Sequence, residues 1–313
     1  MLKKLISIVF SIILMLNLVA CDSGIPIATG GTSGTYYGFT SDIATYLNEN
    51  YKDTFKLKVE STGASKANIQ LVDSGQAKLA MVQNDVMTYA YNAQDLFEGS
   101  EPITSFSAVA SCYPEAVQII ASKNIKDISE LKGKRISVGD AGSGTELNAK
   151  QILDAYGIDV ETDIEKNNQS FADSCDSLKN GTLDAAFVVA GAPTTAITEL
   201  ATAYEFNLLS IDTGHVNALR NSYGYFTETQ IPAGTYAGVN YNVRTVAVMA
   251  TFIARNDLEE DFVYNFTKAL FENKDNFTHQ KAELLDPQTG HSGITIPFHP
   301  GAEKYYKEIG IIK

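Results

Sequence analysis

The sequence predicts an α/β protein of two similar lobes, each a parallel sheet covered by helices. Three observations lead to this fold class. Short β-branched stretches alternate with segments of helical periodicity, a pattern that favours parallel sheets. A glycine-rich loop that opens a helix occurs twice, at 30–35 and 139–145, and a similar turn-and-strand segment follows in each half, at 74–82 and 180–188. The near-equal offsets of these segments indicate two related units.

The strands are predicted from apolar, β-branched runs between turn residues. The segment 55–60 alternates Phe, Leu and Val with Lys, which is typical of a half-buried strand. In chain order, the predicted strands are 25–28, 55–60, 79–82, 117–121, 135–138, 185–189, 208–211 and 246–253.

The helices are predicted where apolar residues recur at helical spacing. The first follows the first glycine loop, and the third follows the second loop. In chain order, the predicted helices are 36–48, 66–74, 146–156, 171–178, 194–204, 258–272 and 302–309.

Composition limits the class of protein. The 313 residues are 44% hydrophobic and 19% charged, and the formal net charge is −13. This is a globular balance and not that of a disordered chain, and the length suits two domains. The acidic charge repels phosphate backbones, so we expect no nucleic-acid partner.

The N-terminus has the features of an export signal. Lys3 and Lys4 precede an apolar run over 5–20 that ends in Leu18-Val19-Ala20-Cys21. This ending resembles a bacterial lipobox, although a chance cysteine at the end of a leader is the alternative. We therefore predict a lipoprotein signal peptide over 1–20 and a lipidated Cys21. The protein would then be extracytoplasmic and anchored to the cell membrane.

Two further cysteines, Cys112 and Cys175, could pair in an oxidising compartment. Their spacing does not decide the matter, and the alternative is a pair of small buried thiols.

The two glycine loops are candidate ligand sites. Glycine allows close backbone approach, and free N–H groups at a helix N-terminus attract anions. Ser33, Thr35, Ser143 and Thr145 add hydroxyl donors to these loops. Plain helix capping is the alternative role of such residues. Because both loops follow presumed parallel strands, where open α/β sheets bind ligands, we favour the binding role.

Sequence motifs give little support for catalysis. Neither loop ends in Gly-Lys-Ser/Thr, and neither fits a dinucleotide fingerprint with its acidic partner. The four histidines show no metal-ligand spacing with cysteines. We therefore predict no enzyme activity, no cofactor and no metal.

Tyrosine is abundant, with 16 residues against no tryptophan. Its amphipathic ring suits closure over a small polar ligand, although most tyrosines are expected to be half-buried packing residues. Tyr36, directly after the first loop, and Tyr225, in a Gly/Pro-rich stretch, are the predicted exceptions.

An ordered set of motifs resembles the TAXI group of TRAP-transporter solute-binding proteins over almost the whole chain after the leader. The motifs are Thr29-Gly30-Gly31-Thr32-Ser33-Gly34-Thr35-Tyr36-Tyr37, Ser74-Gly75 leading to Met81-Val82-Gln83-Asn84-Asp85, Tyr113-Pro114-Glu115, Leu131-Lys132-Gly133-Lys134-Arg135, Gly142-Ser143-Gly144-Thr145-Glu146, Ala190-Gly191-Ala192-Pro193-Thr194, Ile231-Pro232-Ala233-Gly234-Thr235-Tyr236 and Phe298-His299-Pro300-Gly301-Ala302. Ser33 and Arg244 depart from the residues usual in that group, glycine and proline.

The resemblance implies a type II periplasmic-binding-protein fold with two hinge segments and a ligand cleft between the lobes. Residues 21–113 plus 234–313 would form lobe 1, and residues 114–233 would form lobe 2. It implies a monomeric receptor that captures glutamate, a glutamate-like amino acid or a dicarboxylate and delivers it to a TRAP membrane permease. A ligand sensor for a signalling protein and an ABC-type receptor are the alternatives, and an enzyme on this fold is a weaker one.

The predicted ligand-binding residues come from both lobes. They are Ser33, Thr35, Tyr36, Gln83 and Asn84 from lobe 1 and Ser143, Thr145, Glu146, Gly191 and Tyr225 from lobe 2. The two Ser-Gly-Thr turns would hold carboxylate oxygens. Glu146 would accept from an ammonium group, unless it is a solvated residue that complements the helix dipole. The loops offer no arginine to clamp a carboxylate, and Arg220 and Arg244 are the alternative helpers.

Overall fold

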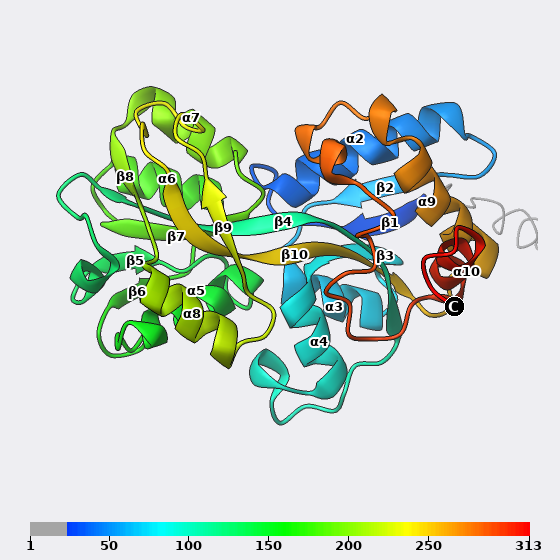
Figure 1. Ribbon diagram of the computed structural model, residues 1–313, viewed down its shortest axis with the longest axis horizontal. Coiled ribbons are helices and arrows are strands. Elements are labelled where there is room, and N and C mark those ends of the chain that lie inside the picture. The colour runs from blue at the N-terminus through cyan, green and yellow to red at the C-terminus, as the bar shows by residue number, and fades with distance from the viewer. Residues whose placement is uncertain (1–23) are drawn as a thin grey trace, which may run out of the picture.

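The computed structural model describes residues 24–313. Two lobes lie side by side, with both β1 and the C-terminal helix in lobe 1 (Figure 1). The predicted signal peptide and Cys21 lie outside the described residues. Among the helices of residues 24–313, none is long and apolar enough to cross a membrane.

Lobe 1 begins with a three-stranded parallel unit. Strand β1 (Ile25–Ala28) pairs with β2 (Leu57–Glu60) on one side and β3 (Leu79–Gln83) on the other. The crossover from β1 to β2 contains helix α2 (Thr35–Asn50), and the crossover from β2 to β3 contains α3 (Ser65–Asp73).

Lobe 2 repeats this unit. Strand β5 (Arg135–Ser137) pairs in parallel with β6 (Glu165–Asn167) and β7 (Ala185–Ala190). Helix α5 (Gly144–Ala155) lies between β5 and β6, and α6 (Phe171–Lys179) lies between β6 and β7. The central strand of each unit is the one that enters a glycine loop, so the topology confirms the internal repeat.

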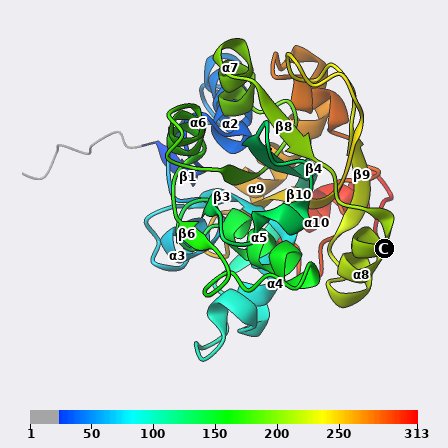
Figure 2. The same ribbon diagram turned by 90° about the vertical axis from the view of Figure 1, so that its left-hand side faces the viewer.

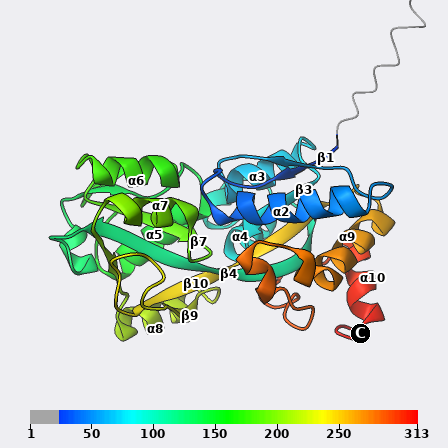
Figure 3. The same ribbon diagram turned by 90° about the horizontal axis from the view of Figure 1, so that it is seen from above.

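Two long antiparallel strands join the lobes into one sheet. They are β4 (Phe106–Ser122) and β10 (Val243–Arg255), and they run from lobe to lobe beside one another (Figure 3). The last part of β10 pairs with β3, while β4 pairs with β7 in lobe 2. The predicted strands 117–121 and 246–253 are segments of these strands. Their apolar pattern does not reveal that they pass between two cores.

The remaining elements complete the covering layers. Strand β8 (Phe206–Leu209) pairs with β4, and β9 (Thr227–Ile231) pairs with β10. The helices are α4 (Asn84–Asn92), α7 (Thr195–Ala203), α8 (Thr213–Ser222), α9 (Glu260–Glu272) and α10 (Pro300–Glu308), and short 3₁₀ turns lie at Asp95–Phe97, Ile128–Leu131, Lys274–Asn276 and Gln280–Leu284.

All seven predicted helices are present, with ends that differ by one or two residues. The prediction missed α4, α8, β6 and β9. The sequence of β6 is Glu-Lys-Asn, and that of β9 is Thr-Glu-Thr-Gln-Ile, so both strands are largely polar. Helix α8 buries only Val216 and Leu219. The two strands lack a hydrophobic pattern, and their pairing comes from tertiary contacts. Helices α4 and α8, in contrast, are at least as amphipathic as the predicted α2 and α5, and the prediction did not identify them.

Helices cover both faces of the sheet in each lobe. In lobe 1, α2, α9 and α10 contribute to one core cluster, while α3 and α4 contribute to the other. In lobe 2, α5 and α8 pack on one face and α6 and α7 on the other, as Figure 2 shows from the lobe 2 side.

The packing places the second boundary between the lobes later in the chain than the sequence predicts. Tyr236, Val239 and Val243 belong to the same buried cluster as Leu178 and Ala186 of lobe 2. The segment 234–247 therefore packs with lobe 2, and not with lobe 1 as the boundary at 233/234 implies. We propose that the chain returns to lobe 1 within β10, near Val248, where pairing passes from β9 to β3.

Candidate functional site

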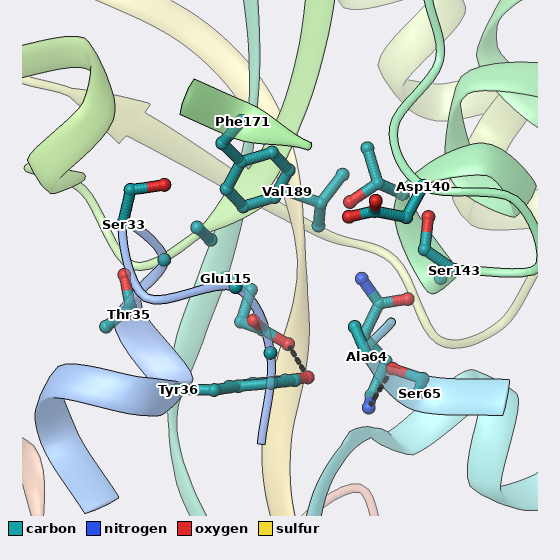
Figure 4. Close-up of a pocket in the computed structure, with 17 residues that line it drawn as sticks. Ser33, Thr35, Tyr36, Ala64, Ser65, Glu115, Asp140, Ser143, Phe171 and Val189 are labelled. Carbon is teal, nitrogen blue, oxygen red and sulfur yellow. Dashed lines mark hydrogen bonds between the residues drawn. The ribbon is translucent and has the colours of Figure 1, made fainter. Parts of the chain in front are cut away.

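A cavity lies between the lobes at the ends of the parallel strands. Its walls come from the first glycine loop and α2, the start of α3, the end of β3, the middle of β4, the second glycine loop, α6 and β7 (Figure 4). The space open to the centres of water molecules is about 40 Å³. One water needs roughly 10–15 Å³ on this measure, so the cavity suits a few waters or one compact solute.

The first glycine loop presents the N-terminus of α2 to the cavity. The residue that precedes the helix is Gly34, which has no side chain with which to cap the free N–H groups. Ser33, Gly34 and Thr35 all line the cavity. The Thr35 hydroxyl donates to the carbonyl oxygen of Gly191 at 3.0 Å, so it holds the two lobes together as well.

Helix α3 also begins at the cavity. The residue before it, Ala64, has a φ of 65° and a ψ of −148°, a region that residues with a side chain rarely adopt. Ser65 Oγ accepts from the backbone N–H of Gln83 at 3.1 Å. The strained Ala64 and the buried Ser65 thereby place the start of α3 against the end of β3.

The second glycine loop presents the N-terminus of α5. Ser143 caps this helix, because its Oγ accepts from the N–H of Glu146 at 3.1 Å. Gly139 has a φ of 90°, and a Cβ there would lie 2.7 Å from Thr145 Cγ2, so only glycine suits this turn. Helix capping and ligand binding are therefore not exclusive for Ser143, because this residue caps α5 and also lines the cavity.

The floor of the cavity carries a buried carboxyl group. Glu115, in the middle of β4, is 2% exposed. Its Oε2 accepts from the Tyr36 hydroxyl at 2.7 Å (Figure 4). Burial raises the pKa of Glu115 well above its ordinary range, and the Tyr36 hydrogen bond offsets this only in part.

Gln83 and Asp140 add two further acceptor groups to the cavity, beside the hydroxyl groups of its serines and threonines. Gln83 is 2% exposed, and its Oε1 has no hydrogen-bond partner. Asp140 lines the lobe 2 wall, and partial burial raises the pKa of its carboxyl group. The described lining residues include no lysine, arginine or histidine. The cavity therefore combines helix N-termini, which favour anions, with carboxyl and amide acceptors, which favour a cation or donor.

Contacts between the lobes close the cavity. Lys281 Nζ donates to the Ala192 carbonyl, and the N–H of Ala196 donates to the Ser33 carbonyl at 3.3 Å. Behind the cavity, Asn148 Nδ2 of α5 donates to Asp85 Oδ2 of α4 at 2.9 Å. The structure is thus that of a closed two-lobed molecule.

The structure brings six of the ten predicted ligand residues to the cavity. These are Ser33, Thr35, Tyr36, Gln83, Ser143 and Thr145. Gly191 lies just beyond the lining residues Val189 and Ala190, and it accepts from Thr35.

The other three lie elsewhere. The Asn84 side chain bonds the Gly293 carbonyl and the Met249 N–H, which ties α4 to β10. Glu146 turns away from the cavity, since its oxygens accept from Gly142 N and Asn168 Nδ2. Tyr225 packs edge-on against Tyr89 of lobe 1 at 5.6 Å between ring centroids. An ammonium partner at Glu146 is therefore not supported by the geometry.

The alternative arginine helpers also lie outside the lining set. Arg244 is on β10, where its Nε lies 3.4 Å from Glu228 Oε1, and Arg220 is in the last turn of α8.

Sequence reasoning missed Glu115, Asp140 and Phe171 as lining residues. Glu115 did carry a signal, because it is the single charged residue of a long strand, and a buried acid is rare without a partner or a role. Phe171, the first residue of α6, reaches the cavity only because α6 packs beside the first glycine loop: a Cβ on Gly34 would lie 3.6 Å from its ring.

Cys112 and Cys175 are both buried and free. Burial raises the pKa of the Cys175 thiol to about 12. Among the described residues, no cluster of three or more His, Cys, Asp or Glu side chains could hold a metal ion.

The sequence profile of a family described as NMT1-like matches residues 27–310. Several solved structures are similar over most of the chain. The alkanesulfonate-binding protein SsuA from Xanthomonas axonopodis pv. citri, bound to MOPS, is 15% identical with a TM-score of 0.51, over 90% of this chain and 83% of that one. PhnD1 from Prochlorococcus marinus MIT 9301, in complex with methylphosphonate, is 12% identical with a TM-score of 0.52, over 92% and 98%.

A third structure, a protein from Bordetella bronchiseptica RB50, is 15% identical with a TM-score of 0.54, over 90% of this chain and 88% of that one. At these identities the similarity establishes the fold. It is the periplasmic-binding-protein fold, as the sequence predicts.

Proposed function

The chain belongs to the NMT1-like family, and on this premise we propose that it is an extracytoplasmic receptor for a small, carboxylate-bearing solute. The observation that carries the proposal is the cavity between two related lobes, lined by the N-termini of α2, α3 and α5. Free N–H groups at helix N-termini bind anionic oxygens, and closure of the two lobes would remove the solute from water.

The proposed solute is glutamate, a glutamate-like amino acid or a dicarboxylate. Ser33, Ser143 and Thr145 line the cavity, and in this proposal their hydroxyl groups bind carboxylate oxygens together with the helix N-termini. Without a lining arginine or lysine, carboxylate binding rests on neutral donors. A sulfonate or phosphonate is the alternative anion, favoured by the MOPS and methylphosphonate in two structures of the same fold.

We propose that the receptor delivers its solute to a TRAP membrane permease as a monomer tethered through Cys21. The ordered motifs that resemble the TAXI group support this partner. An ABC-type transporter and a membrane signalling protein are the alternatives. A pull-down with detergent-solubilised TRAP and ABC permeases from the source organism tests the partner. We expect the TRAP permease to be retained, and retention of an ABC permease in its place would overturn the TRAP assignment.

The solute class is tested by thermal shift after the protein has been unfolded and refolded to remove bound solute. We expect L-glutamate or a related amino acid to raise Tm by roughly 5 °C at 100 times Kd, since ligand at that level adds about 2.7 kcal/mol. The comparison set contains 2-oxoglutarate, 2-hydroxyglutarate, glutarate, methylphosphonate and MOPS. A shift with only the sulfonate or phosphonate would contradict the carboxylate proposal.

A further inference from the structure

We propose that Glu115 binds an ammonium group of the solute, which makes the cavity selective for amino acids over the corresponding oxo acids, hydroxy acids and dicarboxylates. This inference rests on the proposed receptor function and narrows its substrate class. It assigns a specificity-determining residue that lies outside the two glycine loops.

The position of Glu115 supports this role. It lies on β4, one of the two strands that pass between the lobes, and it forms part of the floor of the cavity between them. One hydrogen bond, from Tyr36 to Oε2, is recorded for the side chain. A carboxylate has two oxygens and about four acceptor sites, so Glu115 retains acceptor capacity for a donor in the cavity.

Gln83 provides a second acceptor in the same cavity. Its side chain is 2% exposed, and Oε1 has no partner. A buried amide oxygen left without a donor destabilises the folded protein. An ammonium group has three donors and no acceptor, so it can satisfy both Glu115 and Gln83.

The chemical character of the cavity separates into two parts. The helix N-termini of α2 and α5, with Ser33 and Ser143, offer donors. Gln83 offers an acceptor at the end of β3, and Glu115 offers one on β4. A zwitterion matches both parts, whereas a dicarboxylate would place a second negative charge near a buried carboxyl group, which is unfavourable.

Asp140 is a weaker candidate for the ammonium group. It belongs to the second glycine loop and is only partly buried, so water can solvate its carboxylate. Glu146, the residue that the sequence indicated, already accepts from the Gly142 N–H and Asn168 Nδ2, and its Oε1 lies 3.7 Å from the Lys166 ammonium nitrogen in an ion pair.

Binding of an ammonium group has a measurable proton linkage. Burial raises the pKa of Glu115, and so shifts its equilibrium toward the protonated acid in the empty site. A bound ammonium group stabilises the Glu115 carboxylate, so binding releases the proton from Glu115. The titratable groups around Glu115 are Tyr36 on α2, Tyr113 and Cys112 on β4, Asp85 on α4 and Asp140. Burial raises the pKa of both tyrosines and of the Cys112 thiol well above the ordinary values, so none of the three exchanges this proton near neutral pH.

The first experiment uses the wild-type protein. Calorimetry compares L-glutamate with 2-oxoglutarate, and L-leucine with its 2-oxo acid, in buffers of different ionisation enthalpy at pH 7. Where one of these pairs binds, we expect the amino acid to bind at least about tenfold more tightly than its 2-oxo acid. We expect binding of the amino acid to release up to about one proton. We expect no proton release with the oxo acid.

The second experiment replaces the carboxyl group with an isosteric amide. We expect Glu115→Gln to weaken amino-acid binding at least about tenfold, abolish proton release and leave the binding of the oxo acid within about threefold. The exposed Glu199→Gln on α7 is the matched control. Glu115→Asp, which keeps the charge, should retain part of the preference and of the proton release if the Gln variant is unstable.

The outcomes distinguish the two proposals. If oxo acids bind as tightly as amino acids, or Glu115→Gln keeps the preference, the ammonium assignment is wrong and the carboxylate receptor stands. If neither member of any pair binds, and methylphosphonate or MOPS does, both proposals are wrong. Co-purified solute identified by native mass spectrometry gives an independent check, because a dicarboxylate without an amino group also contradicts the assignment.

Discussion

Replacing Gly144 by alanine is expected to weaken solute binding by roughly 100-fold. A Cβ on Gly144 would lie 1.9 Å from Gln83 Oε1 and 2.3 Å from Gln83 Cδ. Gln83 is buried and lines the cavity, so its side chain must move into the solute space or the lobes must stay apart. Overpacking of this kind costs about 1–3 kcal/mol, and each 1.4 kcal/mol is about tenfold in Kd.

The matched control is Gly224→Ala, at an exposed glycine that does not line the cavity. A Cβ on Gly224 meets no heavy atom within 4 Å, and its φ is not in the left-handed region. We expect this variant to bind within about threefold of wild type. Calorimetry with the tightest-binding amino acid gives Kd for each variant, and small-angle scattering shows whether the solute still compacts the molecule. Equal affinity of Gly144→Ala and wild type would show that the closed arrangement of Gln83 and Gly144 is not the binding arrangement.

Replacing Asp85 by asparagine is expected to change how stability depends on pH. Asp85 is 2% exposed, its Oδ2 accepts from Asn148 across the lobes, and burial raises its pKa from 3.8 to about 6. The folded protein therefore holds this proton more tightly than the unfolded chain. The stabilisation from protonation is fully present below about pH 4 and is lost as the pH rises through about 6.

Asparagine removes this loss, and its single oxygen keeps one of the two hydrogen bonds that Asp85 accepts, from the Val86 N–H at 2.8 Å. The amide at position 85 can also donate to Asn148 Oδ1, which has no partner. The free energy of unfolding of Asp85→Asn, relative to wild type, should increase by about 3 kcal/mol between pH 4 and pH 8, since one pKa unit corresponds to about 1.4 kcal/mol. Urea unfolding across that range measures the difference.

The exposed Asp53→Asn is the control for the change of charge. The difference in the free energy of unfolding between Asp53→Asn and wild type should vary by less than about 0.5 kcal/mol over the same pH range. A pH-independent difference between Asp85→Asn and wild type would show that Asp85 ionises freely in the folded protein, and that its contact with Asn148 does not desolvate it.

The two predictions concern different parts of the contact between the lobes. Gly144 meets Gln83 at the cavity, whereas Asp85 meets Asn148 behind it. Leu147, on the same helix as Asn148, packs into the lobe 1 cluster with Val82 and Ile69. The first turns of α5 are thus shared between the solute site and the interface of the lobes, so that closure and binding are coupled through one helix.

The sequence by itself determined the two α/β units, seven of the nine α-helices of residues 24–313 and the two glycine loops at the cavity. These features are local. A strand, a glycine turn and an amphipathic helix each leave a pattern within about 15 residues. The polar strands β6 and β9 leave no such pattern, and their existence depends on the elements that pack beside them. Helices α4 and α8 do have an amphipathic pattern, which the prediction did not use.

The tertiary structure decided which polar residues face the solute. Glu146 and Glu115 are both single acids near sequence motifs, yet Glu146 turns back onto its own loop and Glu115 faces the cavity. The choice depends on the course of β4 between the lobes and on the contact of Tyr36 with Glu115, which are 79 residues apart. Hydrogen bonds between residues so far apart in the chain follow from how the lobes pack together, and no local pattern encodes that packing.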